Sequence, residues 1–72
     1  MRYFLMIHYQ TIEGITSKRI GEYDSLEDAE LEVKALEKNG FNKDVKGDSG
    51  ITNYFYYPPS SIIRYHIGMA PK

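Results

Sequence analysis

The sequence predicts an α+β fold: a two-layer sandwich in which one helix packs on one face of an antiparallel β-sheet. Two observations support this prediction. Several segments alternate apolar and polar residues at period two, and one segment, at about 26–39, shows helical spacing instead. Turn residues separate them and give the order β-β-α-β-β-β. The chain has 72 residues, so we expect a single domain spanning 1–72.

Two strands and a turn account for the first third of the chain. The segment 2–13 is rich in aromatic and β-branched residues and is apolar on both sides near Phe4 to Ile7, which predicts a central strand covered on both faces. Glu13-Gly14 supplies a turn signal. The segment 15–23 is more polar, and Lys18 and Arg19 suit an exposed edge strand. We expect these strands to form an antiparallel hairpin.

The helix has the clearest signals in the chain. Ser25 is a good N-cap residue, and Asp28 three positions later completes a variant of the capping box. The apolar stripe that would face the sheet consists of Leu26, Ala29, Val33 and Leu36. Gly40 suits a left-handed C-cap after Asn39. The predicted helix therefore runs from about Leu26 to Asn39.

The remainder of the chain predicts three extended segments. Residues 41–46 form a short strand or arm, and residues 47–50 form a turn. The aromatic segment 51–57 is a strong strand candidate. The prolines within 58–61 end that strand because proline cannot donate to a β-ladder. Residues 62–69 form the last strand.

Composition excludes several classes of protein. The chain has no Cys, so it has neither a disulfide framework nor a Cys-based zinc site. No apolar run approaches the ~20 residues that span a bilayer, and we expect a cytoplasmic protein. A domain this small keeps a stability margin of only ~3–5 kcal/mol, which hardly supports a strained, water-excluding active site. Size therefore favours binding over catalysis.

Charge is unevenly distributed along the chain. Residues 22–37 carry seven acids and one base, whereas the rest carries three acids and eight bases. A helix covering one face would give an acidic helical side and a basic sheet side. This division either guides a partner or is the ordinary distribution of solvated charge.

Aromatic residues exceed what one short helix covers. By strand alternation, Phe55 and Tyr57 point opposite to Tyr54 and Tyr56, so one pair faces away from the helix. An uncovered aromatic patch is typical of an interface. The alternative is that the Pro58-Pro59 connection or the last strand covers it.

No catalytic or metal constellation emerges. Gly47-Asp48-Ser49-Gly50 resembles the string around the nucleophile of trypsin-like serine proteases, but the match stops after four residues and an ordinary turn explains it. His8 and His66 meet if their strands pair, with Asp44 or Asp48 as the nearest candidate third ligand. No recognised ligand spacing supports a metal. We expect a non-enzymatic protein without a cofactor.

The leading hypothesis is a protein-binding module or small regulatory or accessory protein, of a size and texture common in bacteria and phages. It would bind a protein partner, or a second copy as a homodimer, through an aromatic sheet face or the acidic helix. The interface candidates are Phe4, Tyr9, Tyr54, Tyr56, Tyr57 and Tyr65.

The alternative is a single-stranded nucleic-acid-binding protein. Tyr54, Tyr56 and Tyr65 on an open sheet would stack on bases, and nearby cations would contact phosphates. The candidate cations are Arg2, Arg19, Lys43, Lys46 and Arg64. A minor variant of the leading hypothesis has the acidic helix, through Glu27, Glu30 and Glu37, imitate a phosphate backbone.

Overall fold

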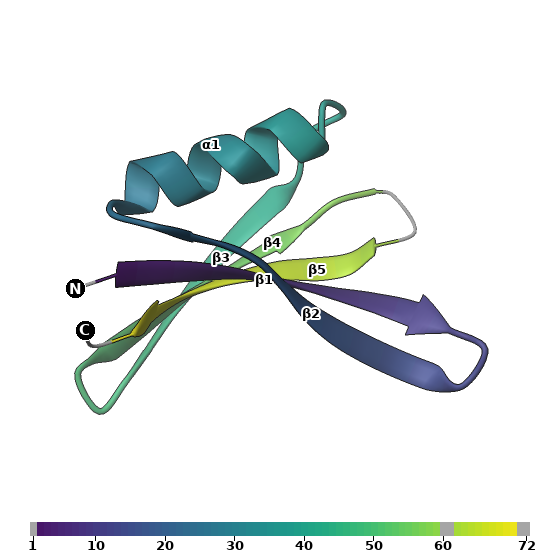
Figure 1. Cartoon of the computed structure of the whole chain (residues 1–72), viewed down its shortest axis with the longest axis horizontal. Helices are drawn as coiled ribbons and strands as arrows, with labels where there is room; N and C mark the ends of the chain where they lie inside the picture. Colours follow the sequence, from purple (N-terminus) through teal and green to yellow (C-terminus); the bar gives the residue numbers. More distant parts are fainter. Residues whose placement is uncertain (1, 60–61, 71–72) are drawn as a thin grey trace.

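The computed structural model describes residues 2–59 and 62–70 and has the predicted α+β order. Its elements are β1 (Arg2–Thr11), β2 (Gly14–Tyr23), α1 (Leu26–Leu36), β3 (Asn42–Asp48), β4 (Ile51–Tyr57) and β5 (Ile62–Ala70). The strands form one five-stranded sheet in the order β2-β1-β5-β4-β3, and every neighbouring pair is antiparallel. Helix α1 lies across one side of this sheet (Figure 1).

β1 and β2 form the predicted antiparallel hairpin, and β2 is an edge strand as expected. The register shifts between Leu5 and Met6, because Leu5 pairs with Gly21 and Met6 with Arg19. Ile20 is thus the extra residue of a β-bulge, which adds twist at this point. The turn end of the hairpin projects beyond α1 (Figure 1).

Helix α1 begins as predicted and ends earlier than predicted. The side chain of Ser25 accepts a hydrogen bond from the backbone N–H of Asp28 at 3.1 Å, so the N-cap is confirmed. The last helical residue is Leu36, and the expected end at Asn39 is wrong. Glu37 leaves helical geometry at φ −117° and ψ 76°. Gly40, at φ 90°, takes the left-handed conformation that reverses the chain toward the sheet.

The turn between β3 and β4 is shorter than the predicted 47–50 segment. The strands pair as far as Asp48 and Ile51, which leaves a two-residue connection. Ser49 and Gly50 both have positive φ, at 52° and 79°. This conformation is that of a type I′ hairpin turn, whose twist matches that of the strands. The segment before this turn, predicted as a short strand or an arm, is the seven-residue strand β3.

The core lies between α1 and the sheet. Its fully buried residues are Leu5, Ala29, Val33, Tyr56, Tyr65 and Ile67. Ala29 and Val33 supply the helix side, which confirms the centre of the predicted stripe. Leu36, predicted to belong to it, is 47% exposed because it occupies the last turn, where the chain already leaves the helix.

β1 is flanked by strands on both edges, but α1 covers only one of its faces. Leu5 is fully buried beneath the helix, whereas its neighbours Phe4 and Met6 are half-buried on the other side. The expectation of a strand covered on both faces is therefore wrong. Apolar residues on both sides of β1 do not require a second covering layer. Helix α1, the one helix in the described ranges, has 11 residues, too few to cross a membrane.

The close approach of α1 to the sheet gives the first testable prediction. Ala29 is completely buried, whereas Ala35 on the same helix is exposed. Ala29→Leu forces extra volume between helix and sheet, and we expect it to lower the free energy of unfolding by about 1–3 kcal/mol. Ala35→Leu is the matched control, and we expect it to change stability by less than about 0.5 kcal/mol. Urea denaturation measures both. Equal effects at the two positions would contradict the packing described.

Candidate functional site

The candidate site is the side of the sheet that faces away from α1, called the open face below. Strand alternation and register place neighbouring residues of four strands on it. Its central residues are Phe4, Met6, His8, Arg19, Asn53, Phe55, Arg64 and His66. Within residues 2–59 and 62–70, the helix is the one element outside the sheet, and it lies on the opposite side (Figure 1).

Aromatic and imidazole rings cross the middle of the open face on three adjacent strands. His66 of β5 stacks on Phe55 of β4, with ring centroids 4.8 Å apart and planes at 14°. Phe4 of β1 meets His66 edge-on, at 5.8 Å and 87°. His8 lies 6.3 Å from His66 in a roughly parallel orientation. The sequence-based expectation that the two histidines meet is thus confirmed.

A missing side chain makes room for this cluster. Gly68 lies opposite Phe4 in the β1–β5 register. A Cβ atom at Gly68 would overlap the tip of the Phe4 ring, so the ring occupies space that any other residue would fill. Phe4 therefore lies against the sheet, and glycine at position 68 is required by this close approach.

Two arginines lie over the phenylalanine rings. The guanidinium carbon of Arg19 is 5.0 Å from the centroid of Phe4, and that of Arg64 is 5.7 Å from the centroid of Phe55. These distances are within the range of cation–π attraction. The ring faces are therefore already in contact with a guanidinium group or an imidazole.

Three of the four cations on the open side have acidic partners. Arg2 contacts Glu22 at 3.2 Å and Asp24 at 3.1 Å, Arg19 contacts Glu22 at 3.4 Å, and Lys46 lies 3.8 Å from Asp44. Arg64 forms no ion pair with any carboxylate in the part of the chain that the structure describes.

Two buried polar atoms of the open face lack a hydrogen-bond partner. They are Nε2 of His8 and Nε of Arg64, two residues that are directly opposite each other in the β1–β5 register. The other ring nitrogen of His8 is 2.7 Å from the hydroxyl of Ser17. His66 is better satisfied, because its Nε2 donates to Oδ1 of Asn53 at 2.8 Å. Unsatisfied buried polar atoms are rare and call for an explanation.

The histidines share a cationic, partly dry environment. Burial, and then the positive charge of Arg64, lowers the pKa of His8. Burial lowers the pKa of His66 as well, and the charges of His8 and Arg64 lower it further. Both rings are therefore neutral at pH 7.

On the helix side, sheet tyrosines reach helix glutamates. The hydroxyl of Tyr56 donates to Glu30 at 2.8 Å, and that of Tyr65 donates to Glu37 at 2.7 Å. Burial, followed by these hydrogen bonds, raises the pKa of both tyrosines far above the usual range. Lys43 contacts Glu30 at 2.6 Å. Burial opposes ionisation of Glu30, but bonds from Lys43 and Tyr56 outweigh it and lower its pKa.

The six predicted interface residues do not all lie on the same side of the sheet. Tyr56 and Tyr65 are buried under α1, so their expected place on a binding surface is wrong. Tyr54 packs on the same core. Tyr9 belongs by alternation to the helix side of β1, in the part of the hairpin beyond α1. Phe4 is central to the open face, and Tyr57 lies on the open side of β4 and is 37% exposed.

The five candidate cations are also divided between the helix side and the open side of the sheet. Lys43 is on the helix side, bound to Glu30, and so does not border the open face. Arg2, Arg19, Lys46 and Arg64 belong to the open side by register. The expected stacking platform is wrong, because its tyrosines, Tyr54, Tyr56 and Tyr65, face the helix.

Five further residues belong to this surface but are not among the interface candidates that the sequence suggests: Met6, His8, Asn53, Phe55 and His66. A usable signal was present in the strand alternation. In β5 the residues in phase with Arg64 and His66 are more polar than those in phase with Tyr65 and Ile67, and the more polar set faces away from a covering helix. In β4 both sets are aromatic, so alternation alone does not choose between them.

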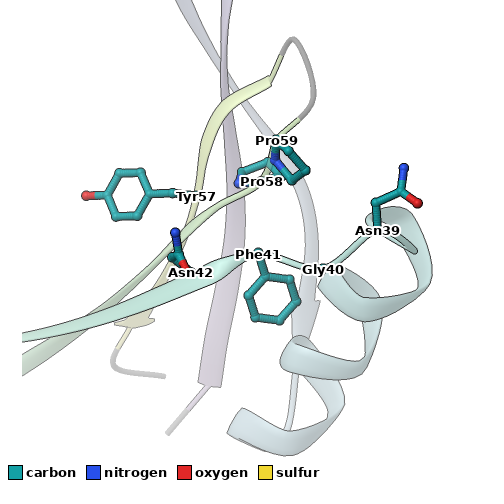
Figure 2. Close-up of a pocket in the computed structure, with 7 residues that line it drawn as sticks. All are labelled: Asn39, Gly40, Phe41, Asn42, Tyr57, Pro58 and Pro59. Carbon is teal, nitrogen blue, oxygen red and sulfur yellow. The ribbon is translucent and has the colours of Figure 1, made fainter.

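A second candidate is a shallow depression of about 440 Å³ at the end of α1, lined by residues 39–42 and 57–59. Figure 2 shows that the ring of Phe41 lies toward α1, whereas Tyr57 extends in a different direction. Phe41 packs edge-on against Tyr56 at 5.2 Å. No Asp, Glu, Lys, Arg or His is among the described residues that line the depression.

Within the described residues, His8 and His66 do not belong to a cluster of side chains that could hold a metal ion. Nowhere in residues 2–59 and 62–70 do three His, Cys, Asp or Glu side chains come together as a metal site would need. The protease-like string contributes its serine to the two-residue turn between β3 and β4.

Comparison with protein-family models finds no match to the chain. Searches of curated proteins and of solved structures find no similar protein either.

The tyrosine–glutamate contacts give the second prediction. Tyr56→Phe removes the hydroxyl that donates to Glu30 and leaves the ring in place. We expect a loss of about 1–3 kcal/mol of unfolding free energy, because the bond is to a charged acceptor in a buried setting. Tyr57→Phe, at an exposed position of the same strand, is the control and should be near neutral. Urea denaturation at pH 7 measures both. A Tyr56→Phe variant as stable as wild type would contradict the proposed role of the bond.

The third prediction concerns the histidines. Removing the charge of Arg64 by Arg64→Gln should raise the pKa of both His8 and His66, as measured by NMR titration of the ring protons. In the wild type the folded pKa values lie below the ordinary value of 6.5, so the unfolded chain binds more protons near that pH. Stability should therefore fall as the pH drops below 6.5. Lys34→Gln, which removes a charge on α1, should leave both histidine pKa values unchanged.

Proposed function

We propose that the protein is a non-enzymatic protein-binding module and that its open face is the contact surface. One observation carries this proposal. At the centre of the uncovered side of the sheet, Phe4, Met6 and Phe55 lie half-buried among histidine and arginine side chains, where solvated sheets normally present only polar residues. A surface of this kind is typical of an interface, in which rigid aromatic residues and arginines contribute most of the binding energy.

The ring orientations favour a protein over a nucleic acid as the occupant. Bases bind by stacking on exposed aromatic faces. Here Phe55 has His66 on one face and Arg64 within cation–π distance, and Phe4 carries Arg19. Most cations of this side are also paired with acids. The protein has a net charge of −1, which provides little of the electrostatic attraction that holds a polynucleotide.

The acidic helix is a weaker candidate for the contact surface. Glu30 and Glu37 accept hydrogen bonds from the core tyrosines, so two of the three acids considered as phosphate mimics hold the helix to the sheet. Substituting them would alter folding as well as binding.

The fourth prediction tests the proposed surface with a matched pair of variants. Phe55→Ser removes an aromatic ring from the open face, and Leu31→Ser removes an exposed apolar side chain from α1. Each protein is used to capture partners from a lysate of the source organism, and the captured protein is then purified and titrated calorimetrically. We expect Phe55→Ser to weaken binding at least about tenfold and Leu31→Ser to leave it unchanged.

Amide NMR spectra of each variant confirm that the fold is retained. A partner that binds both variants as tightly as wild type would contradict the proposed surface. Binding of single-stranded oligothymidine at about 50 mM salt, with the open-face amides shifted, would favour the nucleic-acid alternative instead.

A further inference from the structure

We infer that the open face recognises a carboxylate of an acidic protein segment, which binds at Arg64 beside His8 and is flanked by apolar side chains that contact Phe4 and Phe55. This inference depends on the proposed function, because it names the chemistry of the partner for the same surface.

The first support is the state of Arg64. It is the one cation on the open side that has no carboxylate partner within the described residues, and its Nε is buried without an acceptor. His8, the residue opposite Arg64 in the β1–β5 register, also has a buried atom without a partner, Nε2. A guanidinium group presents several donors in a fork that matches a carboxylate, so rotation of Arg64 toward an acidic partner satisfies the buried donor.

The second support is the balance of charge around this point. Among the side chains that the structure describes, the other charged groups on the open side of β1, β2 and β3 are Arg2, Arg19, Glu22, Asp44 and Lys46, and each lies in an ion pair. They therefore largely neutralise one another. The charge left to be matched is the single guanidinium at the centre, and one carboxylate from a partner complements it.

The apolar surroundings define the rest of the ligand. Phe55 lies within cation–π distance of Arg64, and Met6 and Phe4 extend the apolar surface from there along β1. A partner that covers these side chains excludes water from the ion pair and so strengthens it. A free carboxylate ion leaves these side chains exposed, whereas a peptide with leucine beside glutamate covers them. An acidic, leucine-containing segment thus fits both features of the face.

A second copy of the chain is a less suitable occupant of the open face than an acidic segment. Symmetric pairing of two open faces brings like charges at Arg64 together, and the acids beside it are already paired. The acidic helix of another copy would give a head-to-tail contact, which produces rings or filaments rather than a symmetric dimer.

The experiment uses two blocked pentapeptides, acetyl-Leu-Glu-Leu-Glu-Leu-amide and its counterpart with both glutamates replaced by glutamine. Each is titrated into the full-length protein to about 10 mM, well above a Kd of about 1 mM, while NMR follows the Arg64 Nε–H and the histidine rings. We expect only the glutamate peptide to shift these signals. Because a bound carboxylate favours protonated imidazole, its affinity should increase as the pH falls below 6.5.

Variants separate this inference from the proposed function. Arg64→Gln should weaken binding of the glutamate peptide at least about tenfold, Arg64→Lys should weaken it less, and Lys34→Gln should leave it unchanged. If the Phe55 variant loses the purified partner but the Arg64 variants keep it, the protein-binding function stands and the carboxylate site is wrong.

Three other outcomes would overturn the inference. They are equal binding of the two peptides, no shift with either peptide, and displacement of the glutamate peptide by oligothymidine at lower concentration. Sedimentation velocity over a range of protein concentrations tests the second copy as occupant. Self-association that is lost in the Phe55→Ser variant would assign the open face to the protein itself.

Discussion

Hydrogen bonds from buried tyrosines to helix glutamates hold the two layers of this protein together. Tyr56 and Tyr65 stand under α1 with their rings in the core, and a phenolic hydroxyl in that position requires an acceptor. Glu30 and Glu37 supply it. Because these acceptors lie about two turns apart, one within α1 and one at its C-cap, the contacts fix both the position and the rotation of α1 on the sheet.

This arrangement determines what remains available at the surface. Tyr56 and Tyr65, the large aromatic residues of β4 and β5 that face α1, are buried in the core and bind Glu30 and Glu37, so they are not available to a partner. The other side of the same strands carries Phe55, Arg64 and His66, which pack on one another rather than on a second layer. A single helix of 11 residues cannot cover both faces of five strands. The open face is a direct consequence of that mismatch in area.

Much of the fold could be predicted from local sequence because the signals are local in origin. Ser25 caps the helix through a backbone group three residues away, and Gly40 adopts a positive φ that other residues avoid. The hairpins follow from turn residues and alternating patterns. The site was predicted less well. Phe4, Tyr57 and Arg64 lie on the open side as expected, but Tyr56 and Tyr65 do not, because an aromatic strand pattern is the same whichever face is covered.

The sequence by itself therefore determined the type and order of the elements, the start of the helix and the division between its acidic segment and the basic remainder. The tertiary structure decided which face of each strand meets α1, since that choice depends on the register between strands distant along the chain. It also decided where the helix ends, because Phe41 must return to pack on Tyr56. Finally, it brought His8 beside Arg64 across the β1–β5 pair. No local pattern encodes that proximity, which arises from hydrogen-bond pairing between residues 56 positions apart.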